Sequence, residues 1–352
     1  MHKFTRQLVF LLYSFLFKWV VYSLIFIFGR FGLFKSLFLI YPTDRDECLD
    51  FCPDIPWLRR YFSGRPTPAG LIMDGWRPMG IYFLVPDTAL ELVRKKNRPV
   101  VDGIMERMLW YKKLSGARAI GLAGQLGPVF EKHLGNPLAP PFYTSTYGNV
   151  FSIHSAVTHL VNVSKRKPWQ VSLAIIGGGE LGSQLEKSIS SDGYQIKTVD
   201  IRYTRKGNVK LVDEDFVNKQ LKDVDFAINL LPRGVDFIEC RMHQRIPELA
   251  TVVDFSRPPI RSEAVVQNVV MGNRVQKSGL HFFVKLPGGW KRHELPACSL
   301  PSLLASVGSF TFSNIEEFSL VARQLSYFTA LAHTPETNEK PGVITRPETV
   351  RV

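Results

Sequence analysis

Residues 171–204 constrain the fold of this chain more than any other segment. The segment opens with an apolar run, residues 171–176, of the kind that forms a buried parallel strand. Three glycines follow at the spacing G-x-G-x-x-G, ahead of a helical stretch at residues 183–190. A second apolar strand, residues 194–199, ends on Asp200. This order of strand, glycine-rich turn, helix, strand and acid is typical of a Rossmann dinucleotide site.

The glycines of this segment have separate roles in a dinucleotide site. Gly177 permits the tight turn, Gly179 lets the backbone approach the pyrophosphate, and Gly182 lets helix and strand pack closely. The first N–H groups of the helix, at Glu180 and Leu181, receive the phosphate charge. A glycine-rich turn that binds nothing is the alternative, which the flanking strands and the acid disfavour.

The choice between NAD and NADP stays open in the sequence. Asp200 suits a ribose 2′-hydroxyl and favours NAD, whereas Arg202 and Arg205 suit a 2′-phosphate and favour NADP. We therefore predict a site for NADPH or NADH that uses the glycine turn and these three residues.

The N-terminus carries an apolar run at residues 7–28 that is long enough to span a membrane. It is too long for a signal peptide and lacks a small-residue cleavage site. Lys18 in mid-run, with Ser14 and Tyr22 on the same helical face, favours a helix lying in the interface over a transmembrane anchor. A buried helix of a soluble domain is the third possibility. We predict a membrane-associated protein whose catalytic part faces the cytoplasm.

Charge and cysteine content narrow the classes of partner. The 352 residues carry a net charge of +13, but the basic residues are scattered and no nucleic-acid motif is present. An anionic membrane surface or an acidic carrier protein fits this charge better than nucleic acid. Cys48, Cys52, Cys240 and Cys298 form neither a disulfide framework nor a zinc set, so we predict no metal and a reducing compartment.

The remaining pattern predicts a two-domain α/β protein. Strands at residues 81–85 and 119–123 and helices within 87–114 and 151–163 indicate a separate α/β domain before the Rossmann segment. Further strands are predicted after the glycine-rich segment, at residues 224–231, 251–255 and 280–286. The predicted fold is a Rossmann-type doubly wound parallel sheet plus a second α/β domain and the N-terminal helical segment. The predicted divisions are membrane segment 1–40, linker or cap 41–80, substrate domain 81–165, Rossmann domain 166–330 with Cys298, and disordered tail 331–352.

Cys298 is the candidate nucleophile. It lies just before an apolar, helix-like run at residues 302–307, and a thiol near a helix N-terminus has a lowered pKa. A buried structural cysteine is the alternative for this residue.

The order of these segments resembles the long-chain fatty acyl–acyl carrier protein reductases of cyanobacteria, which form aldehydes. Three segments carry the resemblance: GLAGQLGPVFE at residues 121–131, TYGN at 146–149 ahead of a helix, and Ala297-Cys298 after a Gly-Gly element. The resemblance covers roughly residues 80–325. It implies that Cys298 accepts the acyl group as a thioester, which NADPH reduces to a free aldehyde, and that Gly148 and Asn149 help to shape the acyl site.

The chain departs from the family pattern at three places. Where the family commonly has Gly-Ala-Thr-Gly-Asp-Ile-Gly, residues 177–182 read GGGELG. The family's histidine after the Gly-Asn pair is replaced by Phe151, and His154 is out of register. The N-terminal apolar segment is not part of the soluble family's pattern.

We therefore expect a membrane-attached NAD(P)H-dependent reductase that converts a long-chain acyl thioester, carried by acyl-carrier protein or coenzyme A, to fatty aldehyde. One alternative is another two-domain Rossmann dehydrogenase, related to shikimate dehydrogenase or glutamyl-tRNA reductase, that does not need Cys298. The other is a dinucleotide-binding membrane protein without catalysis. The sequence does not define the oligomeric state.

Overall fold

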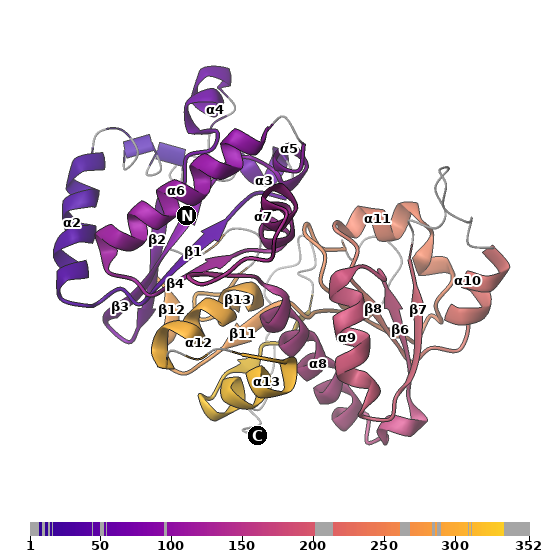
Figure 1. Cartoon of the computed structure of the whole chain (residues 1–352). Helices are drawn as coiled ribbons and strands as arrows, with labels where there is room; N and C mark the ends of the chain where they lie inside the picture. Colours follow the sequence, from indigo (N-terminus) through magenta and orange to yellow (C-terminus); the bar gives the residue numbers. More distant parts are fainter. Residues whose placement is uncertain are drawn as a thin grey trace, which may run out of the picture.

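The structure of the protein is a computed structural model. It describes residues 7–8, 11–12, 15, 17–43, 45–49, 53, 55–94, 97–200, 214–260, 268–283, 286, 290–308, 310 and 312–333. Cys52, Arg202 and Arg205 lie outside the described residues, as does most of the predicted tail. The described residues form two α/β units that lie side by side, each built on a six-stranded sheet (Figure 1).

The first sheet has the strand order β12-β2-β3-β1-β4-β5. Its strands are β1 (Ser36–Ile40), β2 (Thr67–Asp74), β3 (Arg77–Leu84), β4 (Ala119–Leu122), β5 (Phe142–Tyr143) and β12 (Leu280–Phe282). The central strand β1 pairs in parallel with β3 and β4, and β4 with β5, whereas β2 is antiparallel to both β3 and β12. The strand β1 has the sequence SLFLI and is almost wholly buried, as expected of a parallel strand covered on both faces.

The predicted assignment of residues 1–40 to a membrane segment is therefore wrong at residues 36–40. A central parallel strand is apolar on both faces, so its hydropathy continues that of the preceding run. The predicted linker at 41–80 is also wrong, because it contains α3 (Arg45–Cys48), α4 (Pro56–Phe62), β2 and the start of β3. The first domain thus begins at β1 rather than at residue 81.

Helices of the first domain include α5 (Ala89–Leu92), α6 (Arg98–Ser115), α7 (Leu126–Leu134) and α8 (Thr146–Val163). The prediction of helices within residues 87–114 is confirmed by α5 and α6, and Pro99 lies in the first turn of α6, where its missing N–H costs nothing. The helix α8 begins five residues earlier than predicted, so the TYGN segment forms its first turn instead of preceding it.

The helix α2 (Lys18–Arg30) packs along α6 at one end of the molecule (Figure 1). Ile25 is buried in this contact, and a Cβ on Gly29 would come within 2.5 Å of the Ser115 carbonyl oxygen, so only glycine permits the close approach. Within the described part of the chain, no helix combines the length and the apolar character needed to cross a membrane.

The second sheet has the order β15-β10-β9-β8-β6-β7 and confirms the predicted Rossmann arrangement. Its strands are β6 (Ser172–Ile176), β7 (Gln195–Val199), β8 (Phe226–Asn229), β9 (Thr251–Asp254), β10 (Val269–Met271) and β15 (Ala332–His333). The strands β6 to β10 are parallel, with α9 (Glu180–Ser190), α10 (Glu214–Leu221) and α11 (Gly234–Glu239) in the connections. Because β7 and β8 flank β6 on opposite sides, the strand order reverses at β6, which is where such sheets bind ligands.

The chain returns to the first domain after β10, at β12 and the helix α12 (Leu300–Gly308), so the predicted Rossmann boundary of 166–330 is wrong. The strand β12 joins the first sheet instead of the second. A three-stranded sheet, β13-β11-β14, follows, made by Leu295–Pro296, Arg274–Gln276 and Phe328–Thr329. The 3-10 turn η6 (Ala297–Ser299) and the helix α12 then pack on the first domain, ahead of α13 (Ile315–Gln324).

Two further corrections concern the ends of this region. The prediction of disorder from residue 331 is wrong at β15, which pairs antiparallel with β10; residues 334–352 lie outside the described residues. The helix α12 is fixed to the first sheet by small residues, because the hydroxyl oxygens of Ser302 and Ser36 are 3.1 Å apart and Gly121 leaves no room for a side chain beside Ser302. This contact explains why an apolar helix late in the chain belongs to the first domain.

Candidate functional site

The glycine-rich turn connects β6 to α9 in the geometry of a dinucleotide site. Gly177 has φ of +118°, a conformation that only glycine adopts readily. A Cβ on Gly182 would collide with the carbonyl oxygen of Gly177, so this position also requires glycine. Gly179 is the N-cap of α9, and Glu180 and Leu181 are its first helical residues, whose N–H groups face the turn as expected of a phosphate site.

Asp200 lies beside this turn at the carboxyl end of β7. Its Oδ2 atom is 3.6 Å from the position that a Cβ on Gly178 would take, and the residue is buried. A carboxylate at this place is where a Rossmann site holds a ribose hydroxyl. The two arginines predicted to hold a 2′-phosphate, Arg202 and Arg205, lie outside the described residues, so the structure gives the NAD-type feature only.

Cys298 lies where the ends of strands from both domains meet. The backbone of Gly124, just after β4, hydrogen-bonds the sulfur, and the Tyr41 side chain, just after β1, is a close neighbour. Arg257, in the loop that leaves β9, supplies a positive charge to the same place. The predicted nucleophile therefore lies at the carboxyl edges of both sheets, the side on which open α/β sheets bind ligands.

The pKa expected for this thiol was wrong in direction. Burial raises the pKa of Cys298 to about 11, and the Gly124 hydrogen bond and the Arg257 charge only partly oppose that effect. The turn η6 is a single 3-10 turn, and it does not overcome the cost of placing a thiolate in an apolar environment. Part of the Cys298 residue is nevertheless exposed.

Tyr41 belongs to the residues around Cys298, although no sequence pattern identified it. Its hydroxyl oxygen accepts a hydrogen bond from the Gln125 backbone N–H at 3.0 Å. Burial raises the pKa of Tyr41 to about 12, so the phenol stays protonated at neutral pH. Among the described residues its O–H has no acceptor partner, and the hydroxyl lies beside Gly124 and Cys298.

Arg257 is held by contacts from both domains. Its guanidinium forms an ion pair with Glu47 of the first domain and lies 5.4 Å from the ring centroid of Trp290. The carboxylate of Asp254, fully buried at the end of β9, accepts hydrogen bonds from the backbone N–H of Ser256 at 3.0 Å and of Ile260 at 2.7 Å. Asp254 thereby fixes the loop on which Arg257 lies.

Gly148 and Asn149, predicted to shape the acyl site, lie in the first turn of α8. A Cβ on Gly148 would collide with the Ala297 carbonyl oxygen, so this glycine allows the Cys298 turn to pack against α8. Asn149 is buried, and its Oδ1 atom has no hydrogen-bond partner among the described residues. The structure thus gives Gly148 a packing role and leaves Asn149 with a free acceptor near the turn.

Comparisons with known proteins give only distant similarities. No protein-family model and no curated protein matches this chain. A solved dipicolinate synthase structure from Bacillus halodurans is similar at 14% identity, over 40% of this chain and 51% of that chain, with a TM-score of 0.26. A D-isomer specific 2-hydroxyacid dehydrogenase from Xanthobacter autotrophicus Py2, in complex with NADPH and MES, is similar at 14% identity, over 34% and 58%, with a TM-score of 0.24.

A longer match is the N5,N10-methylenetetrahydrofolate dehydrogenase-cyclohydrolase of Trypanosoma brucei, complexed with NADP cofactor and inhibitor. It is 11% identical over 87% of this chain and 96% of that chain, with a TM-score of 0.34. The chain spans only about half of the length of the Bacillus halodurans dipicolinate synthase protein. These similarities carry no argument about substrate, and the fold is defined by the strand order of the chain itself.

Proposed function

We propose that this protein is a membrane-attached, NAD(P)H-dependent reductase of the type that the acyl–acyl carrier protein reductases represent. It converts a long-chain acyl thioester, of acyl-carrier protein or coenzyme A, to a fatty aldehyde through an acyl-Cys298 intermediate. The observation that carries the proposal is the position of Cys298. This partly exposed cysteine lies at the strand ends of both domains, beside Arg257 of the dinucleotide-binding domain.

The first step transfers the acyl group to Cys298. The sulfur attacks the thioester carbonyl carbon, the bond from that carbon to the donor sulfur breaks, and the Cys298 proton leaves on the donor as a free thiol. Since the pKa of Cys298 is about 11, its proton is still bound when the substrate arrives. The positive charge of Arg257 and the Gly124 backbone favour negative charge on the sulfur as the proton leaves.

The second step releases the aldehyde. NAD(P)H bound at the glycine-rich turn would supply the hydride that the acyl carbon gains in this step. The bond from that carbon to Cys298 breaks, and a proton restores the thiol. The Tyr41 O–H, held in place by the Gln125 N–H, donates a hydrogen bond to the carbonyl oxygen while negative charge develops there. Arg257 stabilises the departing sulfur in this step as it does in the first.

Membrane attachment is supported by the outer face of α2. A surface helix normally presents polar residues to solvent, but this face is apolar except at Ser23 and Arg30. Its exposed large side chains are Trp19, Val20, Leu24, Phe26, Ile27, Phe28 and, just beyond the helix, Phe31. Such a helix, lying flat with this face in the headgroup and acyl boundary, would keep the enzyme where long-chain substrates and products partition.

The reductase function is tested by aldehyde release. The full chain should form aldehyde from a long-chain acyl-carrier protein or acyl-coenzyme A only when NADPH or NADH is present. Cys298→Ser should reduce this rate by a factor of about 10³ or more, since the hydroxyl is a far weaker nucleophile. A Cys240→Ser variant, at another cysteine that forms no disulfide among the described residues, should keep the rate of the wild type.

The raised pKa of Cys298 favours one alternative, a two-domain Rossmann dehydrogenase that reduces another substrate in the same crevice without a thioester. In that case Cys298→Ser would retain dinucleotide-dependent activity once the substrate is found. Binding of dinucleotide with no turnover of any acyl thioester would instead favour a sensing protein.

A further inference from the structure

A cavity of about 260 Å³ lies between α2, α4, α6 and the start of β2, at the far end of the first domain from the Rossmann sheet. Its walls combine aromatic rings with positive charge, and the residues that define it are Lys18, Tyr22, Tyr61, Arg65, Arg107 and Tyr111. We call it the α2 cavity. Its size suits a small polar group better than a whole drug-sized ligand.

Among the described residues, no acid neutralises the charge of the α2 cavity. No Asp or Glu lines it, and among the described residues none of Lys18, Arg65 and Arg107 forms an ion pair. The Arg65 guanidinium stacks 4.3 Å from the ring centroid of Tyr61, and Lys18 lies 5.8 Å from that of Tyr22. Three cations around one small space create a positive potential that attracts an anion.

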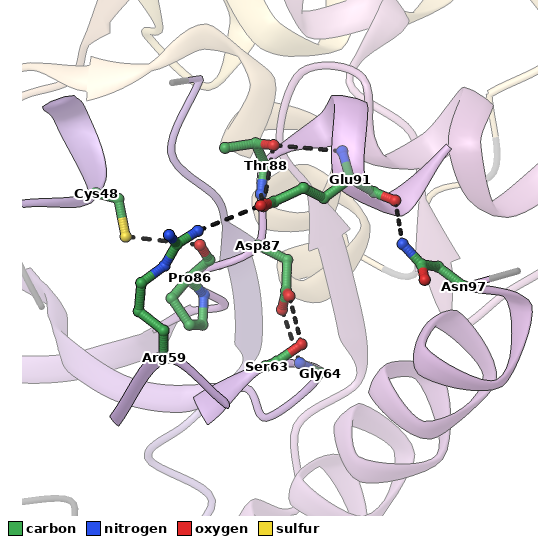
Figure 2. Close-up of polar contacts among 9 residues, drawn as sticks. All are labelled: Cys48, Arg59, Ser63, Gly64, Pro86, Asp87, Thr88, Glu91 and Asn97. Atoms are coloured by element: carbon green, nitrogen blue, oxygen red, sulfur yellow. Dashed lines mark hydrogen bonds and ion pairs between the residues drawn. The ribbon is translucent and has the colours of Figure 1, made fainter. Parts of the chain in front are cut away.

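Two acids of the first domain, Asp87 and Glu91, have partners outside the cavity lining (Figure 2). Asp87 accepts hydrogen bonds from the Ser63 hydroxyl at 2.6 Å and the Gly64 N–H at 2.7 Å. Glu91 forms an ion pair with Arg59 at 3.2 Å. These bonds fasten the turn that precedes Arg65 instead of cancelling the charge of the cavity.

Side chains of α6 also hold the cavity wall in place. Arg107 donates from Nη1 to the Gly64 carbonyl oxygen at 2.6 Å, and the Tyr111 hydroxyl donates to the Pro66 carbonyl oxygen at 3.3 Å. The hydroxyl oxygens of Tyr22 and Tyr111 are 3.1 Å apart, which joins α2 to α6 across the cavity. The cationic groups are therefore held in a prepared arrangement.

The side chains around the cavity indicate which class of anionic ligand it binds. Tyr22, in its wall, contacts Trp110 at 5.3 Å between ring centroids, and Phe15 stacks on Tyr61 at 4.9 Å. Trp110 and Phe15 are exposed, as is Trp57, which contacts Phe15. Trp110 contacts α2 through Tyr22, and Phe15 precedes α2 in the chain. Tryptophan, tyrosine and basic residues together are typical of the headgroup level of a membrane.

We infer that the α2 cavity binds the phosphate of an anionic phospholipid headgroup while the outer face of α2 lies in the acyl boundary. This inference rests on the membrane attachment in the proposed function and adds a lipid-specific site to it. Arginine suits phosphate because its planar guanidinium offers paired donors, so Arg65 and Arg107 are the principal ligands and Lys18 adds charge.

The test measures co-flotation of the full chain with vesicles of phosphatidylcholine alone, or with part of it replaced by phosphatidylglycerol. We expect wild type to prefer the anionic vesicles by about tenfold or more, since each basic residue near such a surface contributes about 1 kcal/mol. The Arg65→Gln/Arg107→Gln variant should lose this preference. Lys112→Gln/Lys113→Gln removes the same charge from α6 outside the cavity and should keep most of it.

Several results would overturn the inference. Equal losses in the two double variants would mean diffuse surface charge, and unchanged binding of the cavity variant would mean no site. Tight binding of glycerol 3-phosphate without vesicles, and its competition with flotation, would mean a soluble phosphate ligand. Because Arg107 also holds Gly64, Arg65→Gln alone provides a second variant, which should lose part of the anionic preference while the Arg107–Gly64 hydrogen bond stays in place.

The same preparations separate this inference from the proposed function. Aldehyde release from soluble acyl-coenzyme A, measured without vesicles, should be unchanged in the cavity variant. A variant that loses anionic preference but keeps aldehyde release supports the lipid site and the reductase together. If wild type releases aldehyde but floats with neither vesicle type, membrane attachment and the lipid site are both wrong, while the reductase reaction stands.

Discussion

The thiol of Cys298 is buried although part of the residue is exposed, and this burial determines its pKa. Burial raises its pKa from 9.0 to about 11, so the folded chain holds this proton more tightly than the unfolded chain. The stability gained from the protonated form is complete below pH 9. It is lost as the pH rises from about 9 towards about 11, because only the unfolded thiol ionises there.

The rate at which iodoacetamide alkylates Cys298, followed at the peptide level by mass spectrometry, should therefore increase with pH. In the folded protein the midpoint of this increase should lie at about 11. In urea the same peptide should follow an ordinary thiol, with a midpoint at 9.0. Arg257→Gln should move the folded midpoint upwards, because the guanidinium favours the thiolate. A folded midpoint near or below that in urea would contradict the account of this site.

The glycines of the cofactor turn make a second residue-scale prediction. In Gly182→Ala the new Cβ meets the Gly177 carbonyl oxygen, so the turn must shift and NADPH binding, measured by titration calorimetry, should weaken by about tenfold or more. Gly103→Ala, in the interior of α6, meets nothing and should raise stability by up to ~1 kcal/mol with binding unchanged. Similar NADPH affinities for the two variants would be the opposing result.

At the scale of elements, the loop after β9 depends on one buried carboxylate. Besides the two backbone donors, Asp254 accepts from the Asn229 side chain at 2.8 Å and the Ser256 hydroxyl at 2.7 Å. Burial raises its pKa, and these hydrogen bonds oppose that rise. The carboxylate thus joins the ends of β8 and β9 to the loop that places Arg257.

Asp254→Asn places an N–H₂ group among these donors and should lower the free energy of unfolding in urea by about 2–4 kcal/mol. Ser256→Ala removes one hydroxyl bond and should lower it by only about 1 kcal/mol. The Asp254 variant should also slow aldehyde release, since the Arg257 loop loses its anchor. Equal, small effects of both substitutions would show that Asp254 does not hold this loop.

The sequence predicted elements whose pattern is local and missed those defined by distant partners. The strand–turn–helix around Gly177 follows from glycine spacing and apolar runs within one short segment, and the structure has it as predicted. The strand β1 was missed because a buried parallel strand and a membrane segment have the same hydropathy. The strand β12 was assigned to the wrong sheet, since nothing in its three residues specifies that β2 is its partner.

The residues of the candidate site also divide into those that the sequence identified and those that depend on distant parts of the chain. Cys298 was found from its place before an apolar run and by resemblance, and Gly148 by resemblance alone. The role of Gly148 as the contact of α8 with the Cys298 turn needed coordinates. Tyr41 was not found, because a tyrosine after an apolar run has no sequence signal until the Gln125 N–H is seen beside it. The direction of the Cys298 pKa was also wrong, since burial depends on segments from the whole chain.

For the whole molecule, the domains meet at the place where the proposed chemistry occurs. The Glu47–Arg257 ion pair joins the first domain to the Rossmann domain at the Cys298 site, and α2 with its apolar outer face lies at the opposite end from α10 (Figure 1). The molecule therefore separates a proposed membrane-facing end from the dinucleotide-binding end, with the thiol between them.

The central claim is that Cys298 carries the acyl group between thioester and aldehyde. Intact-mass spectrometry of the full chain after incubation with a long-chain acyl-coenzyme A tests it most directly. We predict one acyl adduct, mapped to Cys298 and absent in Cys298→Ser, that disappears with release of aldehyde when NADPH is added. No adduct under conditions in which dinucleotide binds, or an adduct that persists with NADPH, would contradict the account.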